Sequence, residues 1–261
     1  MNPEINNGRR KRLAVLLFSS LILFLIVNAP VSLIKVGLEK VGYLTSSASK
    51  APFHPYQLNG TVWHGGADRV VINGQVIGGV EWDFVWSSVL TSVSWKVVLK
   101  GVPDVSASML IGIRLDGTII AHDIRSSFPI DSLLSFLDQD LKALSGKVRV
   151  DLPSLFFKQG DHFNVEGIVD VKGLMIGSDE LGAARAEFTP NGDGTKVVLR
   201  NRGNSKVDLD LLINVEADKS YKAMGKVETE DDTSSLIKTF FAWVGKRDGS
   251  NRYRIDRKGS F

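Results

Sequence analysis

The 261-residue chain is 43% hydrophobic and 23% charged, which is enough apolar content for one or two folded domains and excludes a disordered tail. It contains no cysteine, so disulfides, thiolate nucleophiles and cysteine-ligated zinc are excluded. The net charge of +3 comes from Arg9, Arg10, Lys11 and Arg12 set against Glu4. The remainder holds 28 of the 32 basic and 28 of the 29 acidic residues, so bulk charge does not indicate nucleic-acid binding.

The basic segment at residues 1–12 precedes an apolar run, "LAVLLFSSLILFLIVNAPVSLI". About 20 such residues can cross the hydrocarbon core of a bilayer, so we predict a single transmembrane anchor over residues 13–34. Positive charges before the anchor orient the N-terminus to the cytoplasm and place the rest of the chain in a bacterial periplasm. A cleaved signal peptide ending at Ala29 is the alternative, although Pro30 disfavours cleavage at that bond.

Residues 35–59 are predicted to connect the anchor to the main domain. Apolar residues recur from Val31 to Val41 and suit a short amphipathic helix near the membrane surface. The polar, proline-flanked stretch "TSSASKAPFHP" follows as a linker.

Residues 60–245 have the pattern of a mainly β domain. Asn73-Gly74 and Asp116-Gly117 each lie between apolar-rich runs and predict hairpins. Frequent turns favour an antiparallel sheet, either curved or closed into a partly open barrel. "GTVW" and "IGGVEWDF" weakly resemble "GIVD" and "LGAARAEF" further along, which suggests two similar halves.

Two helices are expected to interrupt the strands, over residues 129–144 and 232–245, because leucine, isoleucine and phenylalanine recur there at helical spacing. The last segment, residues 246–261, is rich in arginine and lysine. We expect it to be a solvated, flexible tail.

The sequence offers no catalytic, cofactor-binding or metal-binding constellation. The histidines His54, His64, His122 and His162 are isolated from one another and lack metal-ligand spacing. His122 stands near two serines, but no strained nucleophile turn of the Gly-x-Ser-x-Gly kind occurs. The glycines of "NGDGT" lack the lysine of a phosphate-binding loop. We therefore predict no cofactor and no enzymatic activity.

The stretch "GTVWHGG" combines a tryptophan with glycines that allow bends or close backbone contacts. We expect Trp63 in a strand, on one apolar face with Trp82, Trp86 and Trp95. His64 would then point to the opposite face, because strand side chains alternate.

The motifs "APVSLI", "GTVWHGGA", "IGGVEWDF" and "FPIDSLL" resemble protein N of the bacterial type II secretion system. The motif residues are Gly60, Thr61, Val62, Trp63, Gly65, Ala67, Gly78, Gly79 and Trp82. The resemblance implies an inner-membrane protein with a periplasmic domain, accessory to the export of folded proteins. It implies partners among the other secretion subunits and no catalytic residues.

Two functions fit this reading. The first is an accessory component of the secretion apparatus that uses its sheet edges and anchor for protein-protein contacts. The alternative is a periplasmic carrier, whose curved sheet presents an apolar groove to lipid or another hydrophobic ligand. The sequence does not indicate an oligomeric state.

Overall fold

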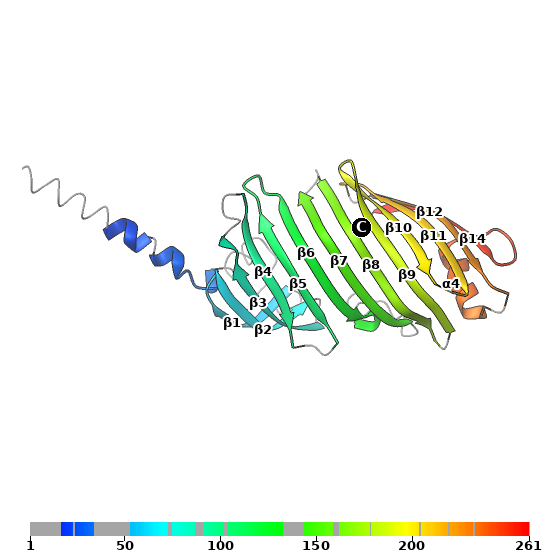
Figure 1. Cartoon of the computed structure of the whole chain (residues 1–261), viewed down its shortest axis with the longest axis horizontal. Helices are drawn as coiled ribbons and strands as arrows, with labels where there is room; N and C mark the ends of the chain where they lie inside the picture. The colour runs from blue at the N-terminus through cyan, green and yellow to red at the C-terminus, as the bar shows by residue number, and fades with distance from the viewer. Residues whose placement is uncertain are drawn as a thin grey trace, which may run out of the picture.

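One open antiparallel sheet dominates the computed structural model of the chain (Figure 1). The structure describes residues 17–22, 24–33, 53–72, 75–86, 91–101, 104–132, 144–158, 162–177, 179–203, 205–218, 220–231 and 233–260. Fourteen strands follow one another in sequence order from β1 to β12, and β14 and β13 then complete the sheet. The predicted mainly β, antiparallel class is confirmed, and the sheet is open.

The strands vary in length from two to fifteen residues. Their bounds are β1 (Phe53–Gly60), β2 (His64–Ile72), β3 (Gln75–Phe84), β4 (Val93–Lys100), β5 (Ser106–Ile113), β6 (Ile119–Pro129), β7 (Leu144–Lys158), β8 (His162–Ile176), β9 (Asp179–Asn191), β10 (Gly194–Arg202), β11 (Val207–Val215), β12 (Ser220–Thr229), β13 (Lys246–Arg247) and β14 (Arg252–Ser260).

Short turns explain the sequential order, because an antiparallel neighbour can be reached through a tight hairpin. The predicted Asp116-Gly117 turn joins β5 to β6: the Thr118 amide donates to the Asp116 carboxylate at 3.0 Å, and Gly117 has φ +81°. Asn73-Gly74 lies outside the described residues, between β2 and β3, which pair antiparallel.

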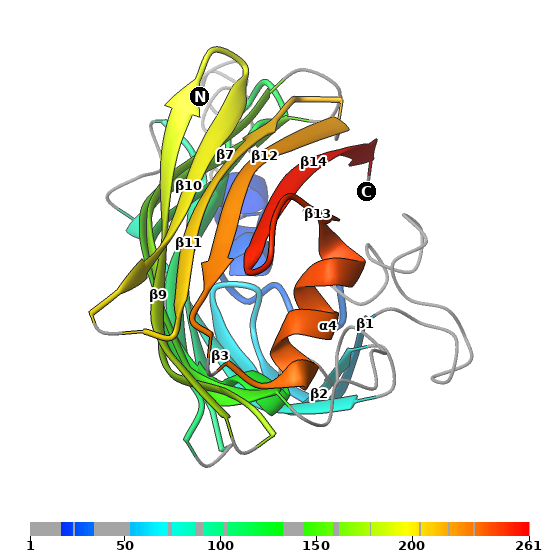
Figure 2. The same ribbon diagram turned by 90° about the vertical axis from the view of Figure 1, so that its right-hand side faces the viewer.

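The sheet is strongly curved, and helix α4 (Ser235–Val244) lies on its concave side (Figure 2). We call this side the inner face and the convex side the outer face. Ser234 caps the helix by accepting a hydrogen bond from the Ile237 amide at 3.4 Å. The helix predicted over residues 232–245 is confirmed.

A compact core lies between α4 and the last strands of the sheet. Ile237 of the helix and Val227 of β12 are both fully buried. Around them pack Ile176, Leu181, Val207, Phe241, Tyr253 and Ile255. This core closes one end of the inner face.

Strand alternation gives the sheet one face on which apolar side chains predominate and one on which charged and apolar side chains are mixed. Starting from Val207 and Val227 under α4, the pairing register assigns the inner positions strand by strand. On β4 to β11 most of these positions are apolar and half-buried: Val97, Leu99, Met109, Ile111, Ile124, Phe128, Val148, Val150, Val169, Val171, Ala186, Val197, Leu199, Leu209, Leu211 and Ile213. Ser126 of β6 and Asn201 of β10 are polar residues at inner positions.

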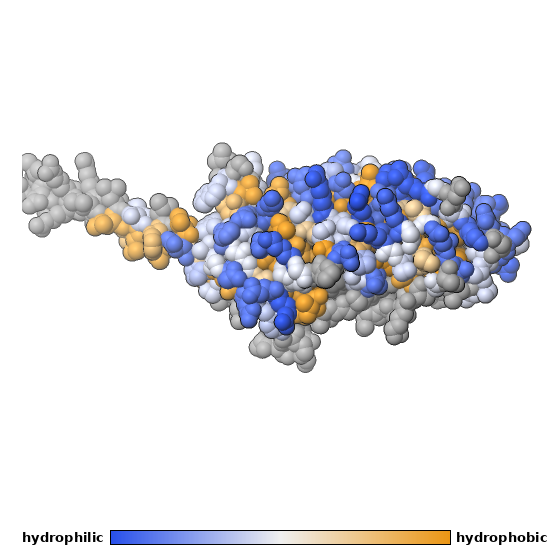
Figure 3. Space-filling view, turned by 60° about the horizontal axis from the view of Figure 1, so that its bottom comes forward, coloured by the Kyte–Doolittle hydropathy of each residue, from blue (hydrophilic) through white to orange (hydrophobic). Residues whose placement is uncertain are grey.

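The outer face carries the ion pairs of the same strands. Lys100 contacts Glu81 at 2.5 Å, and Arg200 contacts Asp210 at 3.1 Å. Arg185 binds Asp170 through two hydrogen bonds of 2.7 Å, which lower the pKa of the Asp170 carboxyl. Hydrophilic side chains are mixed with weakly polar residues and smaller hydrophobic patches on the surface visible in Figure 3.

The sheet extends beyond the limits expected from sequence. Residues 53–59, expected in a linker, form most of β1. Residues 252–260, expected in a flexible tail, form β14, which pairs along the whole of β12. The side chains of β14 alternate as in a strand with one buried face. Tyr253 and Ile255 point into the core, and arginines take the alternate outer positions.

The helix expected over residues 129–144 has incorrect ends, since Pro129 belongs to β6 and Leu144 to β7. Residues 130–132 are helical, and residues 133–143 lie outside the described residues. The juxtamembrane helix expected over residues 30–43 is described only to Leu33.

The expected anchor is described over residues 17–22 and 24–33, and residues 17–22 and 24–27 are helical. Among the described residues, no helix combines the length and apolar character that crossing a membrane requires. The apolar side chains here are nevertheless exposed, including Leu17 at 69% and Phe24 at 62%.

The suggested pair of similar halves does not correspond to equivalent elements. Residues 60–63 end β1 and form a turn, whereas residues 167–170 lie inside β8. Both segments belong to one sheet, whose strands follow sequence order from β1 to β12.

Replacing Ile237 tests the core beneath α4. Ile237→Ala should lower the free energy of unfolding by about 2 to 5 kcal/mol, because the buried side chain leaves a cavity. Urea unfolding of the purified chain, followed by far-ultraviolet circular dichroism, measures the loss. The exposed Thr239→Ala on the same helix should stay within about 0.5 kcal/mol of wild type, and equal losses in both variants would contradict the assigned core.

Candidate functional site

The turn between β1 and β2 is held by several backbone and side-chain hydrogen bonds. The Thr61 amide donates to the His64 carbonyl at 2.8 Å. The Thr61 hydroxyl accepts from the amides of Trp63 and His64, at 3.2 and 3.1 Å. One threonine thereby holds both sides of the turn in place.

Two glycines allow the backbones to approach this closely. Gly60 has φ +85°, and a Cβ there would lie 2.4 Å from the His64 carbonyl oxygen. A Cβ at Gly65 would lie 2.4 Å from the Asn59 carbonyl oxygen and 2.9 Å from the Trp82 ring. A side chain at either position would push the turn away from β3.

Three tryptophan side chains donate hydrogen bonds at this turn. The Trp82 indole donates to the Thr61 carbonyl at 3.1 Å, and the Trp95 indole donates to the Val62 carbonyl at 3.0 Å. The Trp63 indole donates to the Ile26 carbonyl at 2.6 Å. Two strands of the sheet therefore bind the turn, and the turn binds the apolar segment.

The rings of these residues form an aromatic cluster that we define as Trp63, Phe84, Trp86 and Trp95. Phe84 packs edge-on against Trp63 and Trp86, with ring centroids 4.7 Å apart in each pair. Trp86 stacks on Trp63 at 5.8 Å and is 64% exposed. The cluster places the inner face of β3 and β4 in contact with the turn.

The apolar N-terminal segment joins the same turn through its backbone. The Val62 amide donates to the Ala29 carbonyl at 3.0 Å, and the Val31 amide donates to the Gly60 carbonyl at 3.4 Å. Pro30 and Thr61 form an isolated antiparallel bridge, and Val31 is buried. We call this arrangement of segment, turn and tryptophans the junction.

The nine motif residues expected from sequence lie in the turn and in the two strands that follow it, and Gly78 and Gly79 face Val70 and Lys100 further along the sheet. Gly60 to Trp63 form the turn, Gly65 and Ala67 begin β2, and Gly78, Gly79 and Trp82 lie in β3. Trp63 was expected in a strand, and this was wrong, because the positive φ of Gly60 and the Thr61 hydroxyl bend the chain first. Trp82 and Trp95 do lie on neighbouring strands and share the inner face.

The histidines occupy separate places. His64 is exposed and contacts the Asp83 carboxylate across β2 and β3, on the outer face. The Thr61 hydroxyl beside it is bonded to backbone, so it is not activated by the imidazole. His122 packs edge-on against Phe156 at 5.7 Å. Within the described part of the chain, no three acidic or histidine residues are grouped to hold a metal ion.

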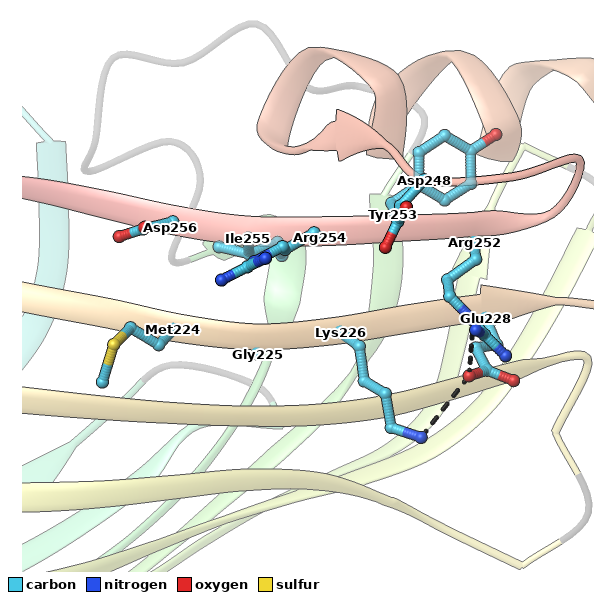
Figure 4. Close-up of a pocket in the computed structure, with 10 residues that line it drawn as sticks. All are labelled: Met224, Gly225, Lys226, Glu228, Asp248, Arg252, Tyr253, Arg254, Ile255 and Asp256. Carbon is cyan, nitrogen blue, oxygen red and sulfur yellow. Dashed lines mark hydrogen bonds and ion pairs between the residues drawn. The ribbon is translucent and has the colours of Figure 1, made fainter.

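A shallow hollow on β12 and β14 is lined by charged residues (Figure 4). Glu228 accepts from Arg252 at 3.0 Å and from Lys226 at 3.4 Å. With Asp248, Arg254 and Asp256, which also line the hollow, the three acidic and three basic side chains balance, so the hollow needs no bound ion to balance its charge. The junction is therefore the better candidate for a functional site.

Sequence reasoning placed the tryptophans on one face but missed their hydrogen bonds. A half-buried indole N–H needs an acceptor, and carbonyls of an irregular turn are natural acceptors because they lie outside the sheet ladder. The combination of four tryptophans and a glycine-rich turn was the available signal.

Residues 56–256 match the family model for the type II secretion system (T2SS), protein N. One relative is the type II secretion system protein N of Vibrio cholerae serotype O1 (strain ATCC 39315 / El Tor Inaba N16961). It is 21% identical over 210 residues, which cover 77% of this chain and 82% of the relative. No solved structure matches the chain.

The chain belongs to the type II secretion system protein N family. It is a type II secretion component, and the resemblance found in the sequence is confirmed. This is a family of secretion components and is not known as an enzyme family. Membership also implies interaction with other type II secretion subunits.

The contribution of one indole to the stability of the junction can be measured. Trp95→Phe keeps an aromatic ring but leaves the Val62 carbonyl without its donor, so the free energy of unfolding should fall by about 1 to 3 kcal/mol. Urea unfolding of the full chain in detergent reports the change. Trp86→Phe, at the exposed ring, should cost less than about 0.5 kcal/mol, and the reverse order would contradict the assigned role of the indole.

Proposed function

We propose that the chain is an accessory inner-membrane component of the type II secretion system, which supports export of folded proteins through protein-protein contacts. Residues 1–12 lie in the cytoplasm, residues 13–34 form the anchor, and residues 35–52 connect the anchor to a periplasmic β domain. The family match is the observation that carries the secretion role.

The exposed apolar segment and the basic residues before it support this topology. Arg9, Arg10, Lys11 and Arg12 precede the segment, and positive charges favour the cytoplasmic side. From Leu17 to Val27 the described apolar side chains are 42% to 69% exposed, which is costly in water and favourable in lipid. The junction then joins the sheet to residues 26–31, at the end of the anchor that leads to the periplasmic domain.

The open sheet supplies a mode of contact, because an edge strand presents unpaired backbone groups. At one end, the two-residue strand β13 and β14 beside it carry arginines and lysines, which discourage the addition of another strand. β1 at the other end has no residue of permanent charge between Phe53 and Gly60. We therefore assign β1 as the edge that receives a strand from another secretion subunit.

Lysines introduced at the β1 edge should block this contact. The exposed Tyr56 and Gln57 are replaced in the double variant Tyr56→Lys/Gln57→Lys. In cells, the yield of chemical crosslinks to other secretion subunits should fall at least fivefold, and secretion of an exported protein should fall with it. The control Ser106→Lys/Ser145→Lys adds the same charge to exposed positions of inner strands of the sheet. Unchanged crosslinks in the β1 variant, or equal losses in the control, would contradict the assignment.

The topology can be tested with single cysteines, because the chain contains none. In cells with a permeabilised outer membrane, a bilayer-impermeant maleimide should label Ser145→Cys and should not label Asn6→Cys. The mass of the intact mature protein separates the anchor from a signal peptide, since the anchor predicts that residues 1–29 are retained. Labelling only at residue 6, or a mature protein beginning at Pro30, would overturn the proposed topology.

A further inference from the structure

We propose that the inner face of the sheet binds the acyl chains of membrane phospholipids. This is a ligand-binding role in addition to the proposed secretion contacts. It relies on the anchor only for the source of the lipid.

The inner face offers a largely apolar surface, interrupted by Ser126 of β6, and its cover is incomplete. Its central residues on β4 to β11 are mostly half-buried, and Ile113 and Ile119 near the strand ends are 48% and 37% exposed. Among the described elements, α4 is the helix that packs on this face, over a core formed by the last strands together with Ile176 and Leu181 near the ends of β8 and β9. An apolar surface of this extent is favourable only when something apolar lies on it.

The chemistry of the surface favours a hydrocarbon ligand. The strands of this region pair on both sides, so their backbone groups are satisfied within the sheet. A peptide lying on the inner face would therefore find no partners for its own backbone groups, which is unfavourable in an apolar site. An acyl chain has no polar groups to satisfy, and it is bound by apolar contact alone.

The dimensions also fit. Adjacent strands are about 4.8 Å apart, so the eight strands from β4 to β11 span about 34 Å. The hydrocarbon core of a bilayer is about 30 Å thick, so the acyl chains of one leaflet extend about 15 Å. The inner face is long enough to hold such a chain across several strands.

The apolar surface is continuous with the apolar segment. Phe84 and Trp95 belong to the inner face and to the aromatic cluster. Trp63 of the same cluster binds the Ile26 carbonyl, next to the exposed side chains of Phe24 and Leu25. One end of the surface thus begins beside the segment that we place in the membrane, and the core under α4 closes the other end.

Photolabelling tests the proposal directly. The full chain is reconstituted in nanodiscs that contain phosphatidylethanolamine with a diazirine on one acyl chain. After irradiation, digestion and mass spectrometry locate the labelled residues. We expect labels at inner positions of β4 to β11 at least tenfold above outer positions of the same strands, together with labels on residues 17–27.

The label pattern separates failure of this proposal from failure of the anchor. Labels confined to residues 17–27 would overturn lipid binding by the sheet and leave the anchor standing. Labels on the inner face without labels on residues 17–27 would support lipid binding and count against the anchor. Covalent dimers of the chain crosslinked through the inner face would show that a second copy occupies it, which overturns the proposal.

A matched pair of variants tests whether the acyl chains bind the inner face and not the outer face. Val97 and Val98 are adjacent half-buried residues of β4, with Val97 on the inner face between Trp82 and Met109. Val97→Asp should reduce inner-face labelling at least fivefold, and Val98→Asp should leave it within twofold of wild type. Circular dichroism checks the fold of both, and the milder Met109→Asn replaces Val97→Asp if that variant does not fold. An equal loss of inner-face labelling in Val97→Asp and Val98→Asp would overturn the proposal.

Discussion

The hydrogen bonds from tryptophan indoles to backbone carbonyls at the junction determine how the two parts of the molecule are related. A turn carbonyl lies outside the sheet ladder and needs a donor, and Trp82 and Trp95 supply donors from neighbouring strands. The Trp63 indole likewise donates a hydrogen bond to the Ile26 carbonyl, near the end of the apolar helix. The direction in which the sheet leaves that segment, and hence which end of the inner face lies beside it, depends on these contacts.

The second constraint is the alternation of side chains between the two faces of a sheet that does not close into a barrel. Alternation places the ion pairs of β3 to β12 on the outer face, among residues such as Val98 and Leu212, and leaves the inner face mainly aliphatic. A closed barrel would cover its own interior. An open sheet needs other cover, which α4 provides at one end and the aromatic cluster provides at the other. Open edges also remain, and they suit a component that works by contact with other proteins.

Much of this architecture could be predicted from the sequence. The Asp116-Gly117 hairpin and the helix at residues 235–244 carry strong local signals, in turn residues and in helical spacing. The turn at Trp63 could not be assigned so easily, because its shape depends on long-range indole donors. Strand β14 was not predicted, because its arginines and lysine are typical of a solvated tail. Tyr253 and Ile255 alternate with charged residues there and form the buried face of the strand. Curvature and openness depend on bulges and packing summed over many strands, which no single motif specifies.

The attachment of the apolar segment to the turn can be tested most directly with a disulfide, in a chain that has no native cysteine. Pro30 and Thr61 form an antiparallel bridge, and facing residues in such pairs lie within disulfide range. Mild oxidation of Pro30→Cys/Thr61→Cys in membranes should give an intramolecular disulfide in high yield, as should the strand pair Tyr56→Cys/Arg69→Cys of β1 and β2. If the strand pair forms and the 30–61 pair does not, the segment is not joined to the turn and the account is wrong.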